Sequence, residues 1–156
     1  TPSGTPVGLN PGVYGCVGWF DGACEPNPGG VASFAAVIKL PDSVHNITGV
    51  VMDKETSCNV AEYRGAMALM SFFISRKLEH LPIEIYGDSK LVIEQLSGRW
   101  RIKRGVYADV AREALEIRAQ LKAVTFIWIP RELNSVADAL CTIALDDERI
   151  RRSKPQ

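Results

Sequence analysis

The sequence predicts an α/β domain built on a mixed five-stranded sheet, with the first three strands antiparallel and helices flanking the sheet. Three strand-like segments joined by short loops come first, which indicates an antiparallel meander. After residue 58, apolar residues recur with the period of a helix face. Strands then alternate with helices, an order typical of parallel pairing.

The first three elements are apolar runs separated by turn residues. Residues 13–20 form the first run, and the proline- and glycine-rich stretch 25–30 turns the chain into the second run, residues 32–40. A short turn leads to the third run, residues 44–51. Short connections between such runs predict strands that pair with their sequence neighbours.

A long amphipathic helix is predicted next, at residues 59–78. Its apolar face consists of Ala66, Leu69, Met70, Phe73, Ile74 and Leu78. Asn59 is followed three residues later by Glu62, which fits an N-cap with a capping box.

The second half of the chain alternates strands with helices. Short strands are predicted at residues 83–86 and 124–129. The helices of this half are expected, in chain order, at residues 89–97, 105–122 and 135–145. Asp88 and Asn134 directly precede the first and the last of these helices, and we expect both to act as N-caps.

Length and composition indicate one domain. The chain has 156 residues, of which 46% are hydrophobic, enough for a single core. We assign residues 13–146 to the domain, residues 1–12 to a flexible leader, linker or expression remnant, and residues 147–156 to a basic tail. No apolar run approaches the roughly 20 residues of a membrane span, and no signal peptide opens the chain.

The cysteines and charges say less about function. Cysteine occurs at Cys16, Cys24, Cys58 and Cys141, without zinc-ligand spacing. We expect reduced thiols in a cytoplasmic protein, with pairing of one couple left open. The net charge of zero gives no support to nucleic-acid binding.

Two local basic clusters stand out against this neutral background. The first is Arg99, Arg101, Lys103 and Arg104. Because Trp100 lies within it, a nucleic-acid surface and plain solvated charge are equally good readings. The second is Arg149, Arg151, Arg152 and Lys154, which we interpret as a solvated tail.

Four carboxylates lie where an apolar run ends or a helix begins: Asp21, Glu62, Asp88 and Asp138. Taken singly, the last three fit helix capping or a favourable interaction with a helix N-terminus. Asp21 could open the loop that follows the first strand, but it directly follows Trp19 and Phe20, where a core strand favours an apolar residue. A buried carboxylate is costly unless a partner such as a bound cation compensates it. Together the four acids predict a site for hard divalent cations.

Four motifs then appear in order: GWFDGACEPNPGG, NVAEYRGAMAL, IYGDSKLVIEQLSG and WIPRELNSVADAL. Together they resemble type 1 ribonuclease H over about residues 13–145. The resemblance implies the ribonuclease H-like fold and an endonuclease that hydrolyses the RNA strand of RNA/DNA hybrids. The expected products carry 5′-phosphate and 3′-hydroxyl ends.

The resemblance also implies cofactors, ligands and partners. Two Mg²⁺ ions, for which Mn²⁺ could substitute, would be held by the four acids, Asp21, Glu62, Asp88 and Asp138. Substrate contacts are implied for Gly22, Ala23, Cys24, Asn27, Ser57, Cys58 and Asn59. Ser57 is a candidate for a DNA phosphate, whereas Asn27 could also be an ordinary turn residue. We expect a monomer that binds an RNA/DNA hybrid.

Three departures from the family pattern affect these expectations. The stretch IPRELNS lacks the histidine that bacterial members often carry, and Arg131 is the expected catalytic stand-in, as in the archaeal-like branch. Its permanent charge would aid phosphate departure without moving protons, unless Arg131 merely pairs with Glu132. Cys58 replaces a groove-reading asparagine. Residues 98–105 are too short for a basic handle, so hybrid affinity should be modest and salt-sensitive.

Two other functions compete with this hypothesis. A non-catalytic nucleic-acid-binding domain of the same fold is the first, although all four acids are present in this chain. A related nuclease or strand-transfer enzyme acting on DNA is the second. The NPGG loop and the ADAL ending favour the type 1 ribonuclease H branch.

Overall fold

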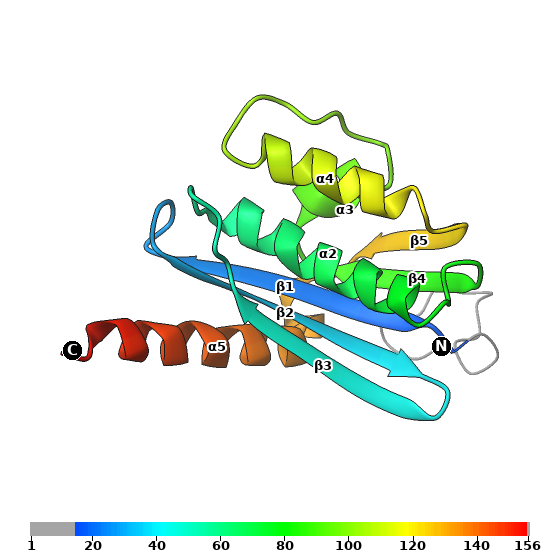
Figure 1. Cartoon of the computed structure of the whole chain (residues 1–156). Helices are drawn as coiled ribbons and strands as arrows, with labels where there is room; N and C mark the ends of the chain where they lie inside the picture. Colours follow the sequence, from blue (N-terminus) through cyan, green and yellow to red (C-terminus); the bar gives the residue numbers. More distant parts are fainter. Residues whose placement is uncertain (1–14, 156) are drawn as a thin grey trace.

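A computed structural model describes residues 15–155 and contains a five-stranded mixed sheet in the order β3-β2-β1-β4-β5 (Figure 1). The strands are β1 (Val17–Glu25), β2 (Val31–Leu40), β3 (Ser43–Val50), β4 (Pro82–Gly87) and β5 (Ala123–Trp128). β1, β2 and β3 pair antiparallel, whereas β4 is parallel to both β1 and β5. The predicted fold class and the order of strands and helices are confirmed.

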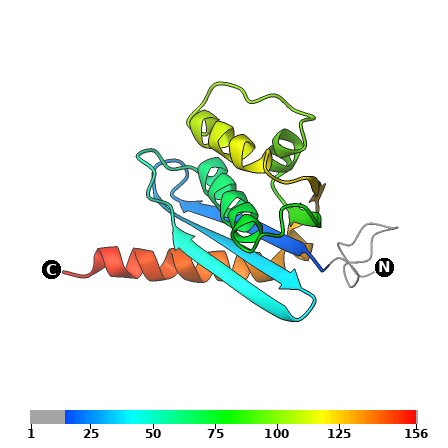
Figure 2. The same ribbon diagram turned by 45° about the vertical axis from the view of Figure 1, so that its right-hand side comes forward.

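Helices cover both faces of the sheet (Figures 1 and 2). They are α2 (Cys58–Ser75), α3 (Lys90–Leu96), α4 (Ala108–Arg118) and α5 (Ser135–Ser153), with a 3-10 turn η1 (Arg131–Leu133) before α5. α2 packs on β1 and β2 with α4 behind it, and α5 lies across β1, β2 and β3 on the opposite face. The site therefore lies on a sheet whose central strand is supported from both sides.

The main core lies between the sheet and α2. Phe20 and Ile38 of the sheet are fully buried there together with Leu69 and Phe73 of α2. This is the helix face that the 3.6-residue period predicted. Truncating such a side chain to alanine typically costs about 2–5 kcal/mol. The core thus rigidly ties α2, which carries one of the predicted acids, to β1, which carries another.

The first strand differs from its prediction in a way that matters for the site. β1 begins at Val17 and continues to Glu25, and its register with β2 pairs Asp21 with Ala35. Asp21 is therefore a mid-strand residue. The sequence suggested that it opens a loop, and this prediction is wrong. The residues after Phe20 are polar or small, so the sequence pattern gave no sign that the strand continues. Pairing with β2 keeps these residues extended. Residues 13 and 14 of the predicted strand, and the predicted leader at 1–12, lie outside the described residues.

Two of the predicted caps are wrong by one or two positions. The α2 N-cap is Ser57, whose hydroxyl accepts from the Val60 N–H, and the α3 N-cap is Ser89, whose hydroxyl accepts from the Val92 N–H. Asn59 lies inside α2, and Asp88 precedes the α3 cap. Both serines satisfy an N–H group that the helix itself leaves free. Asp88 and Glu62 therefore do not cap these helices, which was the main alternative to metal binding for both residues.

The helices of the second half also end differently. The helix expected at 105–122 is the shorter α4, and the helix expected to end at 145 continues to Ser153. The residues assigned to a basic tail thus continue α5 for two more turns. Glu148 stabilises this extension by accepting hydrogen bonds from Arg151 and Arg152 one turn later.

All four cysteines are free thiols, and three of them are buried. Their packing as small apolar side chains agrees with the reduced state expected from their spacing. In the part of the chain that the structure describes, no helix is both long and apolar enough to span a membrane.

Candidate metal centre and hybrid-binding surface

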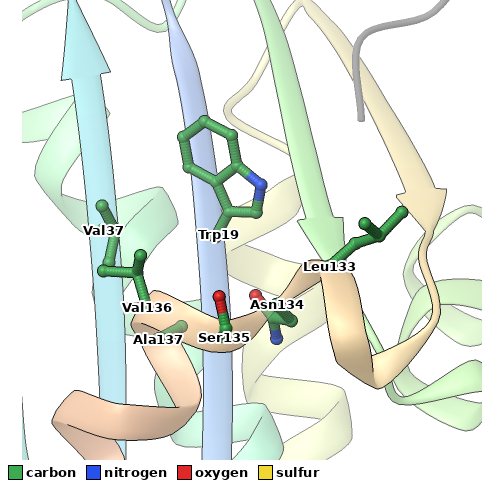
Figure 3. Close-up of a pocket in the computed structure, with 7 residues that line it drawn as sticks. All are labelled: Trp19, Val37, Leu133, Asn134, Ser135, Val136 and Ala137. Carbon is green, nitrogen blue, oxygen red and sulfur yellow. The ribbon is translucent and has the colours of Figure 1, made fainter. Parts of the chain in front are cut away.

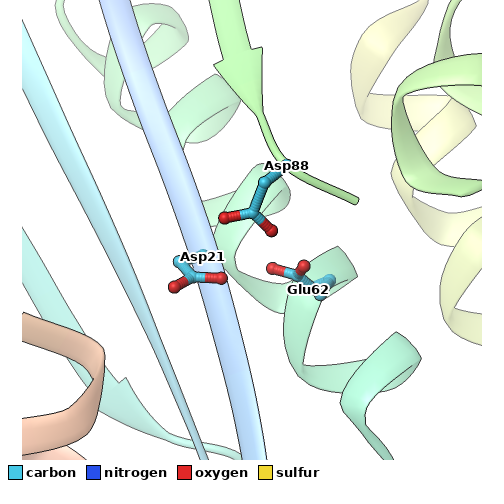
Figure 4. Close-up of side chains that lie close together, drawn as sticks. All are labelled: Asp21, Glu62 and Asp88. Carbon is cyan, nitrogen blue, oxygen red and sulfur yellow. The ribbon is translucent and has the colours of Figure 1, made fainter. Parts of the chain in front are cut away.

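Three of the four predicted acids meet in space. Asp21 on β1, Glu62 in the first turn of α2 and Asp88 after β4 bring carboxylate oxygens within 4.8 Å of one another (Figure 4). They come from residues 41 and 26 positions apart in the chain. Such a group of oxygen ligands suits a hard divalent cation.

Close backbone packing brings Asp21 and Glu62 together. At Gly22, a Cβ atom would lie 2.3 Å from the backbone of Ala61 and Glu62. At Gly65, one turn further along α2, a Cβ atom would lie 2.6 Å from the Asp21 carbonyl oxygen. Both glycines therefore let the strand and the helix approach more closely than any side chain allows. The sequence contains these glycines, but only the packing reveals why they are needed.

Sheet topology supplies Asp88. β4 runs parallel to β1, with Trp19 opposite Tyr86, so the chain leaves β4 two residues later beside Asp21. The carboxyl ends of parallel strands are where ligands gather in α/β sheets. This pairing places Asp88 at such an end, beside Asp21.

Asn134 holds the Asp88 carboxylate in place. Its side-chain amide donates to Asp88 Oδ2 at 3.0 Å and to the Phe20 carbonyl oxygen at 2.9 Å. The indole Nε1 of Trp128 donates to the Asp88 carbonyl oxygen at 3.0 Å. Asn134 is only 1% exposed and occupies the predicted N-cap position of α5, but its side chain makes no capping hydrogen bond there. Sequence reasoning missed this role, because Asp88 lies 46 positions before Asn134 and no local pattern connects the two residues.

The cluster is electrostatically unfavourable without a cation. The pKa of Asp21 is raised to about 7, mainly by burial and also by the nearby Asp88 charge, while hydrogen bonds from its neighbours partly oppose the rise. Glu62 is 8% exposed, and burial followed by the Asp21 charge puts its pKa well above the usual value. Within residues 15–155, its buried Oε1 atom has no hydrogen-bond partner. A divalent cation would satisfy this oxygen and offset the repulsion, so the residues fit a metal.

The fourth acid stands apart from this group. Asp138, in the first turn of α5, is not among the three converging carboxylates, and its side chain is 35% exposed. Its charge nevertheless contributes to the raised pKa of Asp21, so it faces the same site. The Arg131 guanidinium lies 3.5 Å from Asp138 Oδ1, and its side chain is 78% exposed. Arg131 thus pairs with the fourth acid and not with Glu132, which was its structural alternative.

The loop predicted to contact substrate is tied to the start of α2. Asn27 Oδ1 accepts from the Cys58 backbone N–H at 2.9 Å, which leaves the Asn27 NH₂ group on an exposed side chain. The Ser57 hydroxyl accepts its capping bond at 3.1 Å and keeps its own hydrogen free to donate. The Cys24 side chain is buried, so only its backbone could face a ligand. The predicted contacts at 22–27 and 57–59 therefore form one surface beside the acids.

Hydrogen bonds from α3 hold the basic segment 99–104 in place. The Gln95 side chain, which is buried, donates to the Arg101 carbonyl oxygen at 2.9 Å and to the Tyr107 hydroxyl at 3.2 Å. Arg99 pairs with Glu94, whereas Trp100 is about half exposed. Trp100 is thus presented to solvent on a held segment, as a nucleic-acid contact would require.

A separate pocket lies on the α5 side of the sheet (Figure 3). It has a volume of about 220 Å³ and is lined by Trp19, Val37, Leu133, Asn134, Ser135, Val136 and Ala137. None of these residues carries a carboxylate. The pocket shares Asn134 with the acid cluster but offers no ligand set for a cation.

The strand order and the buried carboxylate cluster define the ribonuclease H-like class of fold, and comparisons with known proteins agree. Residues 19–144 match the family described as "Reverse transcriptase-like". A bifunctional protein of Mycobacterium tuberculosis, Rv2228c, is 34% identical over 128 residues, and ribonuclease HI of Halobacterium salinarum is 31% identical over 132 residues. The chain spans about a third (34%) of the length of the first and 63% of the second.

Solved structures show the same relationship. The N-terminal ribonuclease H domain of the M. tuberculosis protein superposes with a TM-score of 0.77 and 31% identity, covering 88% of this chain and 98% of that one. The H. salinarum enzyme gives 0.74 and 30%, covering 85% and 98%. LC11-RNase H1, solved in complex with an RNA/DNA hybrid, gives 0.75 and 26%, covering 85% and 98%. The chain therefore belongs to the type 1 ribonuclease H family.

Proposed function

We propose that this protein is a metal-dependent endonuclease that hydrolyses the RNA strand of RNA/DNA hybrids. The observation that carries the proposal is the buried convergence of Asp21, Glu62 and Asp88, with a Glu62 oxygen left without a partner in the described chain. Two relatives support the substrate class. One bears the name ribonuclease HI, and the other was solved bound to an RNA/DNA hybrid.

Asp21, Glu62 and Asp88 would hold the cations, with Asp138 completing the set. Bound Mg²⁺ ions, or Mn²⁺ in their place, would supply an activated water and charge stabilisation at the scissile phosphate. Asn134 would keep the Asp88 carboxylate oriented through its 3.0 Å hydrogen bond. Arg131 would place a permanent positive charge near the departing oxygen, which leaves as a 3′-hydroxyl opposite a 5′-phosphate.

The surface at 22–27 and 57–59 would bind the hybrid beside these acids. The exposed NH₂ group of Asn27 would donate to a base edge or ribose in the minor groove. Backbone groups at Gly22 and Ala23 would approach the ribose, whose 2′-hydroxyl separates RNA from DNA. The Ser57 hydroxyl would donate to a phosphate oxygen of the DNA strand.

Cleavage of an end-labelled RNA/DNA hybrid with and without Mg²⁺ tests the proposal, with duplex DNA and single-stranded RNA alongside. We expect cutting that requires the metal and is confined to the RNA strand of the hybrid. Binding without cutting under Mg²⁺ and Mn²⁺ would instead identify a non-catalytic domain. Cutting of the duplex DNA would assign the site to a different nuclease class.

A further inference from the structure

A polar cavity of about 220 Å³ lies away from the acid cluster. Its walls are Gly29 and Gly30 of the turn between β1 and β2, the segment 51–56 before α2, and Arg152 of α5. The turn and the C-terminal end of α5 lie at the same end of the molecule (Figure 1). Arg152 reaches this cavity because α5 continues to Ser153, beyond the end that the sequence suggested.

The cavity is continuous with the hybrid-binding surface. The Gly29 N–H donates to the Thr56 carbonyl oxygen at 2.9 Å, and the Thr56 hydroxyl donates to the Gly30 carbonyl oxygen at 2.7 Å. The N–H of Cys58, the residue after Ser57, donates to Asn27 Oδ1. The cavity wall and the predicted contacts at Asn27 and Ser57 are therefore parts of one hydrogen-bonded unit.

The charged side chains that line the cavity are two basic ones, Lys54 and Arg152, and one acidic one, Asp53. The carboxylate of Asp53, which lines it, accepts two hydrogen bonds from Arg64 at 2.8 and 2.9 Å, and the same guanidinium group also pairs with the exposed Glu113. Lys54 is exposed, with no ion pair within the described residues. Arg152 uses its Nε to reach Glu148.

The Glu148 contact does not cancel the charge of Arg152. Arg151 binds the same carboxylate, so two guanidinium groups share one negative charge. One positive charge therefore remains uncompensated within this trio. Asp146 and Arg149 line a neighbouring pocket that Arg152 also lines. The formal charges of Asp146 and Arg149 sum to zero.

We propose that Lys54 and Arg152 form an anchoring site for a backbone phosphate of the hybrid, remote from the site of cleavage. The proposal rests on the function proposed above. Asp21 and Glu25 are four residues apart on β1, which is about 13 Å along an extended strand, and the turn that lines the cavity begins beyond Glu25. At about 3.4 Å per nucleotide along one strand, this spacing corresponds to roughly four nucleotides between the anchored and the scissile phosphate.

Hybrid binding by the full chain, carrying Asp88→Asn to prevent cutting, tests this site. The dissociation constant of a 20-base-pair RNA/DNA hybrid is measured across a series of KCl concentrations. Arg152→Gln and Lys54→Gln should each weaken binding roughly two- to fivefold, as expected for an exposed ion pair. Each should also lower the slope of log K against log salt by about one.

Arg151→Gln is the matched control. It removes the same charge and a contact to the same Glu148 carboxylate, but Arg151 does not line the cavity. We expect a smaller loss of affinity for this variant than for Arg152→Gln, because Glu148 then pairs with Arg152 alone while the Arg152 side chain still lines the cavity. A second control uses a hybrid of six base pairs centred on the acids, which is too short to reach the cavity and should bind all four proteins alike.

Equal weakening by Arg151→Gln and Arg152→Gln would overturn the anchoring site, because the effect would then come from α5 stability or general charge. Unchanged binding in Lys54→Gln and Arg152→Gln would overturn it as well. Failure of the proposed function shows up separately, as the absence of hybrid cleavage by the wild-type chain in Mg²⁺.

Discussion

Asn134 donates a hydrogen bond from its side-chain amide to Asp88 Oδ2 across 46 positions of the chain. The same NH₂ group also donates to the Phe20 carbonyl oxygen, next to Asp21. One buried amide therefore connects the start of α5, the end of β4 and the middle of β1. The relative positions of two candidate metal-binding carboxylates, Asp21 and Asp88, depend on it.

Asn134→Ala should weaken divalent-metal affinity and turnover by about 10–100-fold, because partners of ligands commonly have effects of this size. It should also lower stability by about 1–3 kcal/mol, since the Phe20 carbonyl oxygen would lose a buried donor. Mn²⁺ titration and thermal unfolding measure the two effects. Asn46→Ala, at an exposed position on β3, is the control and should change neither. Metal affinity at the wild-type level would remove Asn134 from the site.

Asp88→Asn should abolish hybrid cleavage while leaving the melting temperature close to that of the wild type. Asp88 is a candidate ligand, and Ser89 is the residue that caps α3. Ser89→Ala should show the reverse pattern, with cleavage retained and stability lowered by about 1 kcal/mol. Cleavage and thermal unfolding of both variants separate the two roles. Retained cleavage with a lowered melting temperature in Asp88→Asn would make Asp88 a cap only.

Metal-free protein should lose stability as the pH rises, through Asp21. Its pKa is raised from 3.8 to about 7, so between these values the folded state keeps a proton that the unfolded chain has released. The stability associated with this group is present below about pH 4 and lost by about pH 7. In chelator, Asp21→Asn should therefore gain stability relative to the wild type between pH 5 and pH 8.

Mg²⁺ at pH 8 should raise the melting temperature of the wild type and have little effect on Asp21→Asn. The cation replaces the proton as the compensating charge, and the variant has lost that ligand. Thermal unfolding of the wild type and Asp21→Asn at pH 5 and pH 8, in chelator or in Mg²⁺, measures these differences. A difference between variant and wild type that does not change with pH would contradict the burial argument.

Arg131→Ala should slow turnover without weakening metal binding, because the guanidinium contacts Asp138 and none of the three converging acids. Single-turnover cleavage at saturating Mg²⁺ and a metal titration measure the two properties. Arg131→Lys keeps the charge and should recover part of the rate. A rate for Arg131→Ala equal to the wild type would exclude this side chain from the mechanism.

Much of the fold was predictable because it depends on local periodicity. The helical period of α2 and the alternation of strands and helices in the second half required no knowledge of packing. Boundaries were less predictable, since they depend on partners. β1 continues through Asp21 to Glu25 because β2 pairs with it, and α5 reaches Ser153 partly because Glu148 binds two later arginines.

For the site, the sequence by itself identified the four candidate carboxylates and showed that a core strand gives no local reason for an acid at Asp21. Tertiary structure decided which of them meet, because Gly22 and Gly65 matter only when β1 and α2 are packed together. It also decided that Ser89 caps α3 and that Asn134 binds Asp88. A hydrogen bond selects its partner by position in space, and here the partner lies far away in the sequence. Local patterns therefore identified the acids, whereas only the folded chain identified what holds them.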